Sequence, residues 1–386
     1  MLMKVLHLID SGGLYGAEKM VLNLMEEQIK MGDSPMLLSA GAHEDGVKAI
    51  ELEARRRNLP VTPWLMKPGL NLCESVRIAR WAKSNGYQIL HSHGYKFNIL
   101  MGLQKLSGLK LPLVTTLHGY VHAPRFSKLW VYEKMDRVFL RLMDRVCLVA
   151  PHMLDLPIVR RLPENKIAVI ENGLPELQPE EQEANLGPEL EQFLKGNTFN
   201  LLAVGRLSPE KNFSELLRAV AREPLNKMQL GLCIVGEGGK RSELERLRKD
   251  LGLEPKVRLL GYRNDVPGLM KHFDLLVIPS LTEGLPITLL EAMRAGLAVL
   301  STAVGGIPQA LDQGRAGILV ESNSCSQLFE GIKRAVNDRH DLIVHTRAGM
   351  RAFEARYTAI AMAQKYRSVY SVLPGQKKPT KPGVTF

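Results

Sequence analysis

The chain has 386 residues, 45% of them hydrophobic and 24% charged, which is the composition of a soluble globular protein and a length that predicts two or three domains. No apolar run approaches the roughly 20 residues that cross a membrane, and the N-terminus enters a strand pattern directly, so we expect a cytoplasmic protein without a signal peptide. The net charge of +11 favours a polyanionic partner such as anionic lipid or a lipid diphosphate, whereas the aromatic content of 6% and the lack of a recognisable module argue against nucleic acid.

A glycine-rich turn follows the first predicted strand. Residues 2–9 form a strand pattern that ends at Asp10, and the segment SGGLYGAEK then leads into a helix over residues 17–30. In a doubly wound sheet, such a turn lets the backbone approach a ligand closely. The spacing is not Gly-x-Gly-x-x-Gly, so a tight structural turn is an equally good interpretation.

Further strand patterns alternate with helical patterns in the first half of the chain. They cover residues 35–39, 88–91, 113–117 and 146–149. This alternation predicts parallel strands joined by right-handed crossovers, and ligands of such sheets collect at the carboxyl ends of the strands. Histidines stand at two of these ends, His91 and His93 at one strand and His118 at the next. A histidine at a strand end more often has a structural role.

A predicted helix over residues 130–145 carries one basic stripe. Its cations recur at helical spacing: Lys134, Arg137, Arg141 and Arg145. Residues 1–175 contain 23 Lys and Arg against 16 Asp and Glu, so this half holds +7 of the net charge. A run of charges is usually a solvated helix face, and the alternative is a docking face for a membrane surface or a lipid diphosphate.

Two cations stand at a strand end early in the second half. A strand predicted over residues 199–204 ends in Gly205 and Arg206, and Lys211 opens the next helix. Such a pair suits a diphosphate, because it offsets the negative charge of the phosphates. The next strand and helix are joined by the glycine-rich turn GEGGK, whose spacing is not that of a Walker loop.

A strand, helix and strand unit follows. The first strand covers residues 275–278 and the second covers residues 297–300. Pro286 suits the first turn of the helix between them, and Gly296 suits the position just past its last turn.

Two glutamates in this unit flank the start of the helix. Glu283 lies in the turn and Glu291 lies eight positions later, about 12 Å away if the interval were helical, so they do not form one carboxylate pair. The amides of residues 284–287 point out of the helix N-terminus, where the dipole favours an anion. This layout matches a nucleotide sugar. The first carboxylate would face the hexose, the helix N-terminus would face the diphosphate, and the second carboxylate would face the ribose. For glutamates considered alone, solvated surface residues would be the ordinary interpretation.

The run PSLTEGLPITLLEAMRAGLAVLSTAVGGIP resembles the Glu-x7-Glu signature of the retaining glycosyltransferases with two Rossmann-like domains, the GT-B group. The resemblance covers about residues 3–372 and is strongest in residues 201–310. One departure is Gln309, where the family commonly has Glu. This position lies past the donor-binding part, so we expect no effect on the chemistry.

The resemblance implies a role for each matching residue. For catalysis it implies Glu283 and also His118, as the strand-end histidine that contacts the transferred sugar. For the donor diphosphate it implies a larger set: Arg206, Lys211, Gly13, Gly16, Gly284 and Leu285. Glu291 would contact the ribose.

Four more residues are candidates for the site, and the resemblance implies the role of two of them, Gly261 and Tyr262. Gly261 and Tyr262 follow a strand and would lie near the base of the nucleotide. For His93, a structural role and an acceptor-side role are both open. Tyr15, in the first glycine-rich turn, is a second acceptor-side candidate.

The expected architecture is GT-B, an α/β fold of two Rossmann-like, doubly wound parallel-sheet domains that face a cleft. An N-terminal acceptor-binding domain would cover residues 1–172, and a linker rich in Pro and Glu would cover residues 173–197. The donor-binding domain would cover residues 198–355. A helix over residues 356–372 would cross back to the first domain and precede a mobile tail over residues 373–386.

The implied function is the transfer of a sugar, with retention of configuration, from a nucleotide-diphosphate sugar to a lipid-linked or saccharide acceptor in cell-envelope polysaccharide or glycolipid synthesis. Alternatives are a soluble acceptor, or a nucleotide-sugar-binding protein or epimerase that transfers nothing. No Asp-x-Asp occurs, so we expect neither a metal nor another cofactor. The cysteines lack metal-ligand spacing, so we expect no zinc and no disulfide. A lipid-linked acceptor would favour peripheral association with the inner face of an anionic membrane.

Overall fold

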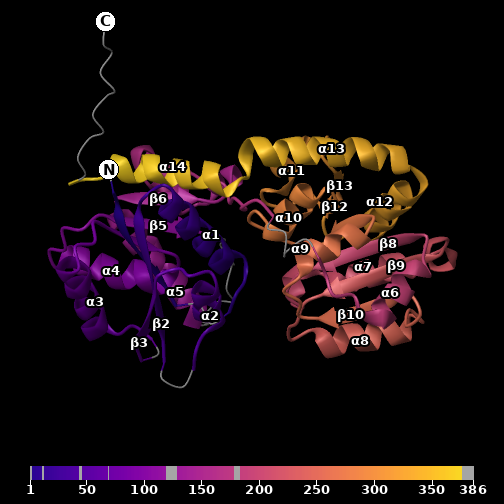
Figure 1. Ribbon diagram of the computed structural model, residues 1–386, viewed down its shortest axis with the longest axis horizontal. Helices are drawn as coiled ribbons and strands as arrows, with labels where there is room; N and C mark the ends of the chain where they lie inside the picture. The colour runs from indigo at the N-terminus through magenta and orange to yellow at the C-terminus, as the bar shows by residue number, and fades with distance from the viewer. Residues whose placement is uncertain are drawn as a thin grey trace, which may run out of the picture. The chain divides into compact units, whose positions relative to one another are not determined.

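The computed structural model describes residues 2–10, 13–42, 46–67, 69–118, 128–177 and 183–375. The chain divides into two compact units (Figure 1). The first contains residues 1–175 and 359–386, and the second contains residues 176–358. Each unit is built on one sheet whose paired strands are parallel, which confirms the predicted α/β class with two parallel-sheet domains.

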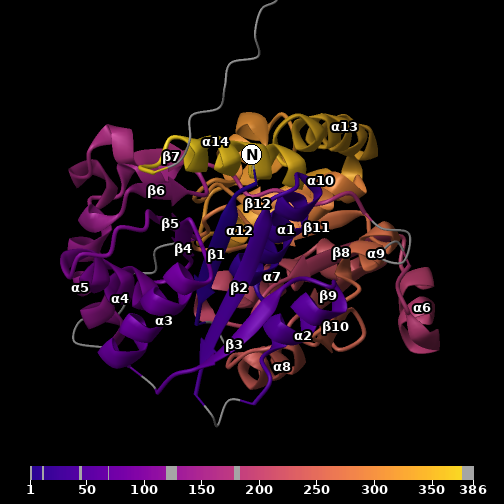
Figure 2. The ribbon, with the colours of Figure 1, turned by 60° about the vertical axis from the view of Figure 1, so that its left-hand side comes forward.

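The first sheet has seven strands in the order β3-β2-β1-β4-β5-β6-β7. Their bounds are β1 Lys4–Ile9, β2 Ser34–Gly41, β3 Val61–Leu65, β4 Ile89–Ser92, β5 Leu113–Leu117, β6 Arg145–Leu148 and β7 Ile167–Val169. Figure 2 shows β1, β2 and β3 side by side. The strand order changes direction between β1 and β4, and the carboxyl ends at such a switch point are where open parallel sheets bind ligands.

Two strands of this sheet, β3 and β7, carry too weak a pattern to be predicted. Both lie at a sheet edge, where only one side is covered by a neighbouring strand. β3 contains Pro63, and none of its residues is fully buried. β7 is three residues long and half-buried throughout. Edge strands of this kind lack the continuous apolar run that marks a central parallel strand.

The helices of the first unit include one from the C-terminal end of the chain. Their bounds are α1 Gly16–Lys30, α2 Ala49–Arg56, α3 Leu72–Ser84, α4 Tyr95–Leu106, α5 Lys128–Phe139 and α14 Ala359–Ser371. α14, which corresponds to the helix predicted over residues 356–372, packs beside α1 (Figure 1). Its buried side chains Met362, Tyr366 and Tyr370 belong to the hydrophobic core of this unit.

The basic stripe predicted over residues 130–145 does not exist as one helix face. α5 ends at Phe139, the 3-10 helix η2 (Leu140–Leu142) follows, and Arg145 begins β6. The apolar run after Arg145 belongs to the sheet, because Val146 is fully buried between partners in β5 and β7. Backbone pairing on both sides therefore overrides the helical spacing of the charges.

A smaller exposed surface remains on α5 and η2. We call it the α5 face, and it consists of Val131, Lys134, Val138 and Arg141. Arg137, the other member of the predicted stripe, is half-buried. On the buried side of α5, Asn98 donates a 2.8 Å hydrogen bond to one carboxylate oxygen of Asp136, and the other oxygen has no partner in the described part of the chain. Burial raises the pKa of Asp136 to about 7.

The second sheet has six strands in the order β10-β9-β8-β11-β12-β13. The strands are β8 Phe199–Val204, β9 Leu230–Val235, β10 Val257–Gly261, β11 Leu275–Ile278, β12 Ala298–Thr302 and β13 Ile318–Val320. The helices are α6 Gly187–Lys195, α7 Phe213–Val220, α8 Arg241–Asp250, α9 Val266–Leu269, α10 Ile287–Ala295, α11 Ile307–Ala310, α12 Cys325–Asn337 and α13 Arg339–Arg356. β8 and β11 occupy the predicted residues. Here the switch point lies between β8 and β11.

Helix α6 lies within the range predicted as a linker, residues 173–197. It is attached to the second unit, because Asn200 at the start of β8 donates a 3.1 Å hydrogen bond to the carbonyl of Leu194. Phe193 and Leu194 are buried. The end of the predicted linker is therefore a helix of the second unit.

Within the described part of the chain, no helix combines the length and the apolar character that a membrane crossing requires.

Candidate functional site

The loops after β8, β9 and β10 are joined at the carboxyl edge of the second sheet. The amide of Leu207 donates to the carbonyl of Glu237 at 2.9 Å, and that of Gly236 donates to Gly261 at 2.8 Å. Gly236 has a φ of +141°, and a Cβ on it would lie 1.9 Å from the carbonyl oxygen of Gly205. Only glycine permits this approach, which fixes the loop that carries the predicted diphosphate cations.

An ion pair joins this loop to the turn after β11. Lys211 Nζ lies 2.5 Å from Glu283 Oε1, and the hydroxyl of Ser280 donates to the same oxygen at 2.7 Å. The amide of Leu281 also donates to the carbonyl of Glu210 at 2.8 Å. The switch point of the second sheet thus brings together two predicted site residues that are 72 positions apart.

This pairing lets one cation serve two anions. The ammonium group of Lys211 has three N–H donors and gives one of them to the Glu283 carboxylate. It can therefore bind a phosphate oxygen while it still orients the carboxylate. Arg206 is exposed on the same loop, between β8 and Lys211. The arrangement can bind an anion and present a carboxylate beside it.

Two glycines after β12 support the turn that carries Glu283. Gly305 has a φ of +59°, and a Cβ on it would lie 1.8 Å from the carbonyl oxygen of Glu283. The next amide, of Gly306, donates to the carbonyl of Gly284 at 2.7 Å. The later part of the signature therefore has a structural reason, because a larger residue at position 305 would push the Glu283 turn away.

Helix α10 begins after this turn and carries the second glutamate. Its N-cap is Pro286, which has extended backbone angles, so the helix starts one residue later than predicted. Leu285 and Glu291 are both buried, and Glu291 lies in the second turn of the helix. A surface position for Glu291 is therefore wrong. Gly296 ends the helix with a φ of +68°, as its predicted position past the last turn requires.

The pair predicted near the nucleotide base lies at the same sheet edge. Gly261 ends β10 with a φ of +72° and accepts the hydrogen bond from the loop after β9. Tyr262 is 60% exposed, so its ring is accessible for stacking. Glu237 and Arg241, joined by a 2.6 Å ion pair, lie beside Gly261.

In the first unit, the turn after β1 is partly outside the described residues. Its described part, from Gly13, leads to Tyr15, which is the N-cap of α1 and is 50% exposed. The amide of Tyr15 donates to the Glu18 carboxylate at 2.9 Å, and Gly16 is the first residue of the helix. The ring of Tyr15 lies where a Cβ on Gly13 would project.

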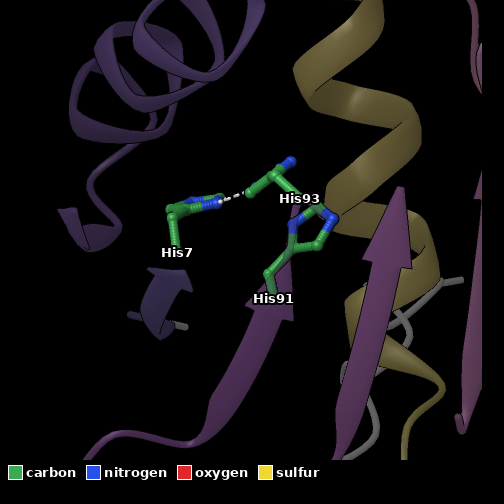
Figure 3. Close-up of side chains that lie close together, drawn as sticks. All are labelled: His7, His91 and His93. Atoms are coloured by element: carbon green, nitrogen blue, oxygen red, sulfur yellow. Dashed lines mark hydrogen bonds between the residues drawn. The ribbon is translucent and has the colours of Figure 1, made fainter. Parts of the chain in front are cut away.

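Four histidines gather at the carboxyl ends of β1, β4 and β5. His7 Nδ1 lies 3.0 Å from His93 Nε2, and His93 Nδ1 lies 3.1 Å from His118 Nε2. The rings of His91 and His93 are tilted against each other by 39°, with centroids 4.2 Å apart (Figure 3). His91 bonds instead to Tyr370 of α14 at 2.7 Å. His7 was not predicted, because one histidine inside a strand carries no signal of its partners.

Burial keeps these imidazoles neutral. It lowers the pKa of His7 and that of His118 to about 4, and it holds the pKa values of His91 and His93 well below the usual range. One nitrogen from each of His7, His91 and His93 lies within 4.8 Å of the others, a spacing that could hold a metal ion. The four cysteines, in contrast, are separate free thiols.

Two family models match the chain. The model for glycosyl transferases group 1 matches residues 190–352, and the model for glycosyltransferase family 4 matches residues 15–176. The chain belongs to this glycosyltransferase family. The matches confirm the family that the signature indicated, and they contain the Lys211 and Glu283 pair in one range and the strand-end His118 in the other.

Curated relatives of this glycosyltransferase act on various acceptors according to their names. The UDP-Gal:alpha-D-GlcNAc-diphosphoundecaprenol alpha-1,3-galactosyltransferase of Escherichia coli is 29% identical over 308 residues, which are 77% of this chain and 76% of the relative. The N-acetylgalactosamine-N,N'-diacetylbacillosaminyl-diphospho-undecaprenol 4-alpha-N-acetylgalactosaminyltransferase of Campylobacter jejuni is 36% identical over 139 residues, or 36% and 37% of the two chains. The D-inositol 3-phosphate glycosyltransferase of Corynebacterium jeikeium is 31% identical over 190 residues, or 46% and 45%.

Solved structures share the fold of the glycosyltransferase. Anabaena HepE, solved in complex with UDP, has a TM-score of 0.81 at 21% identity and covers 96% of this chain and 100% of its own. Sucrose-phosphate synthase of Thermosynechococcus elongatus has a TM-score of 0.78 at 17% identity, with coverages of 95% and 98%. At such identities the likeness concerns the fold alone, and it confirms the expected GT-B fold.

Proposed function

We propose that the protein transfers a sugar from a nucleotide-diphosphate sugar to a saccharide or lipid-linked acceptor, with retention of anomeric configuration. Two relatives support a lipid-linked acceptor, because the names of the Escherichia coli and Campylobacter jejuni enzymes both specify a sugar on a diphosphate-linked undecaprenol. Such acceptors place the reaction in cell-envelope polysaccharide or glycolipid synthesis.

The ion pair between Lys211 and Glu283 is the observation that carries the proposal. A nucleoside diphosphate that leaves the sugar gains negative charge, and fixed cations at that place stabilise the transition state. Lys211 and Arg206 supply them, and the N-terminus of α10 adds its dipole. Glu283, oriented by Lys211 and Ser280, accepts hydrogen bonds from hydroxyl groups of the sugar.

The remaining donor contacts follow from the same edge of the second sheet. Gly284 and Leu285, at the start of α10, complete the diphosphate site, and the buried Glu291 holds the ribose hydroxyls. Gly261 and Tyr262 lie against the base.

Residues of the first unit serve the sugar and the acceptor. His118 binds the transferred sugar, Gly13 and Gly16 let the backbone approach the diphosphate, and Tyr15 and His93 are acceptor-side candidates. The position of His118 supports its role, because His118 follows β5 at the carboxyl edge of the first sheet, next to β4 and one strand away from the switch point between β1 and β4.

The reaction proceeds without a divalent ion in this proposal. The sequence contains no Asp-x-Asp, the motif with which the other large glycosyltransferase fold chelates its metal. Arg206, Lys211 and the helix dipole take over the neutralisation of the leaving group.

The acceptor determines where the enzyme works. For a lipid-linked acceptor, we place the enzyme peripherally on the inner face of an anionic membrane. The α5 face supports this placement, because it combines exposed Lys134 and Arg141 with exposed Val131 and Val138.

Nucleotide release tests the proposal. Parent protein is incubated with a panel of nucleotide sugars, with and without candidate acceptors and with or without a chelator. We expect acceptor-dependent release of nucleoside diphosphate that a chelator does not abolish. Sugar binding without release would favour a binding protein, and a changed sugar without release would favour an epimerase.

Substitutions test whether the cations after β8 bind the nucleoside diphosphate. Arg206→Ala and Lys211→Ala each remove a charge-assisted contact to phosphate, on the order of 1.5–3 kcal/mol, so we expect at least a tenfold weaker affinity for nucleoside diphosphate. Lys195→Ala is the matched control, since Lys195 pairs with Glu191 on the exposed surface of the same unit. Unchanged affinity in both site variants would contradict the diphosphate assignment.

A further inference from the structure

A chain of buried hydrogen bonds ends in an atom without a partner. Gln28 Oε1 lies 2.9 Å from His7 Nε2. The hydrogen bond between His7 and His93 continues the chain (Figure 3), and a second hydrogen bond joins His93 to His118. At the far end, His118 Nδ1 is buried and has no hydrogen-bond partner among the described residues. Leaving a buried polar atom unpaired is unfavourable, so the atom is suited to a ligand that supplies the missing partner.

The chain determines which nitrogen of each ring carries the proton. A neutral imidazole has one N–H donor and one acceptor nitrogen. The Gln28 oxygen only accepts, so His7 carries its proton on Nε2 and accepts at Nδ1. His93 must then donate from Nε2 and accept at Nδ1. His118 in turn donates from Nε2, and its Nδ1 keeps a free lone pair.

The rings stay neutral because they are buried, as their lowered pKa values indicate. A proton added to His7 or to His93 would place two donors face to face and break a hydrogen bond. The chain of hydrogen bonds that starts at Gln28 on α1 therefore fixes the tautomer of each ring as far as His118 after β5, while the rings stay neutral.

We infer that His7 and His93, anchored by Gln28, are positioning residues that hold His118 as its Nε2–H tautomer, so that Nδ1 accepts a hydrogen bond from a hydroxyl group of the donor sugar. The inference deepens the proposed function and rests on the role of His118 in it. It adds His7 and Gln28 to the residues on which the reaction depends, and it gives His93 a role behind His118 in place of direct contact with the acceptor.

A metal ion among His7, His91 and His93 is the competing explanation of the cluster. Both ring nitrogens of His91 already have partners, Tyr370 at 2.7 Å and Thr116 at 2.8 Å. The facing nitrogens of His7 and His93 are bonded to each other. An ion would have to displace these contacts, whereas the chain satisfies them.

The tautomer can be measured on the parent protein. Long-range nitrogen and proton correlation spectra of protein labelled with nitrogen-15 in histidine distinguish protonated from bare ring nitrogens. We expect His118 to show a protonated Nε2 and a bare Nδ1, with the same pattern in His7 and the same in His93. The opposite pattern in His118, or an equal mixture of both tautomers, would overturn the inference. This result does not depend on sugar transfer, so it stands or fails separately from the proposed function.

Variants then connect the chain to turnover. His7→Leu and His93→Leu remove the donor and acceptor from the chain, and we expect a roughly tenfold lower kcat with little change in nucleotide affinity. His7→Gln, which can donate and accept, should recover part of this loss. His91→Leu is the matched control, because His91 is fully buried beside His93 but lies outside the chain.

Three outcomes would overturn the inference. The first is an equal loss of kcat in His91→Leu and His93→Leu, and the second is no recovery in His7→Gln relative to His7→Leu. The third is zinc that stays with the purified parent and is lost from His7→Leu. Where a leucine variant does not fold, the tautomer of His118 in the spectra of the parent protein supports or overturns the inference.

Discussion

Gly305→Ala tests whether the loop after β12 holds in place the turn that carries Glu283, the proposed catalytic residue. The new Cβ would lie 1.8 Å from the carbonyl oxygen of Glu283, whereas carbon and oxygen atoms normally stay more than 3 Å apart. The turn must therefore move by more than 1 Å, and a shift of that size at a reacting group can lower the rate about 100-fold. An alanine at a φ of +59° adds roughly 1–2 kcal/mol of backbone strain. Loss of the bond from Gly306 to Gly284 adds about 1 kcal/mol.

Gly252→Ala separates the strain from the displacement. Gly252 has a similar φ of +65°, but nothing lies within 4 Å of the position that its Cβ would take. We therefore expect Gly252→Ala to be destabilised by strain alone and to keep the parent kcat. Gly305→Ala should lose about 1 kcal/mol more in urea unfolding and about 100-fold in nucleotide release. Equal kcat values for the two variants would refute the idea that the Gly305 loop positions Glu283.

Further predictions concern separate regions. Glu283→Gln should mainly lower kcat and Glu291→Gln should mainly weaken nucleotide binding. Calorimetric titration with the nucleoside diphosphate of the donor, beside steady-state kinetics, would show the opposite split if the roles are exchanged. Burial raises the pKa of Asp136 from 3.8 to about 7 in the folded protein. Between about pH 4 and 7 the folded state therefore keeps a proton on Asp136 that the unfolded state releases. The free energy of unfolding should fall across this pH range as pH rises, by up to about 4 kcal/mol. Asp136→Asn should abolish this fall in thermal unfolding, and parallel pH profiles would contradict it. Replacing Lys134 and Arg141 together by Gln should reduce cosedimentation with anionic liposomes at low salt, by about 1 kcal/mol for each charge, and equal partitioning would remove the α5 face as a docking surface.

The central strands could be predicted from the sequence because burial on both faces leaves a continuous apolar run. β5, β8 and β11 start and end at the predicted residues. The prediction of one basic helix face over residues 130–145 was wrong because it rested on the spacing of charges and not on an apolar run. Helical spacing of charges says nothing about the strand neighbours that bury Val146.

The site could be predicted one residue at a time, but its contacts could not. Glu283 and Lys211 each stand in a recognisable motif, while the 2.5 Å pair between them depends on which strand lies beside β8. The buried chain at His7 depends in the same way on the order of β1 and β4. A hydrophobic pattern along the sequence does not predict which strands are neighbours in the sheet. Contacts between side chains on different strands therefore cannot be predicted until the fold is known.

Helix α14 has a consequence for the biogenesis of the protein. The first unit is discontinuous, since residues 1–175 need residues 359–386 to complete it. Tyr370 belongs to the hydrophobic core of this unit and bonds to the buried ring of His91, so this part of the unit remains open until the ribosome has made α14. At roughly 5–20 residues per second, the intervening 183 residues take about 10–40 s to synthesise. The second unit can therefore fold while the first is still waiting for its last helix, and during this interval the nascent chain exposes the apolar surface that chaperones bind.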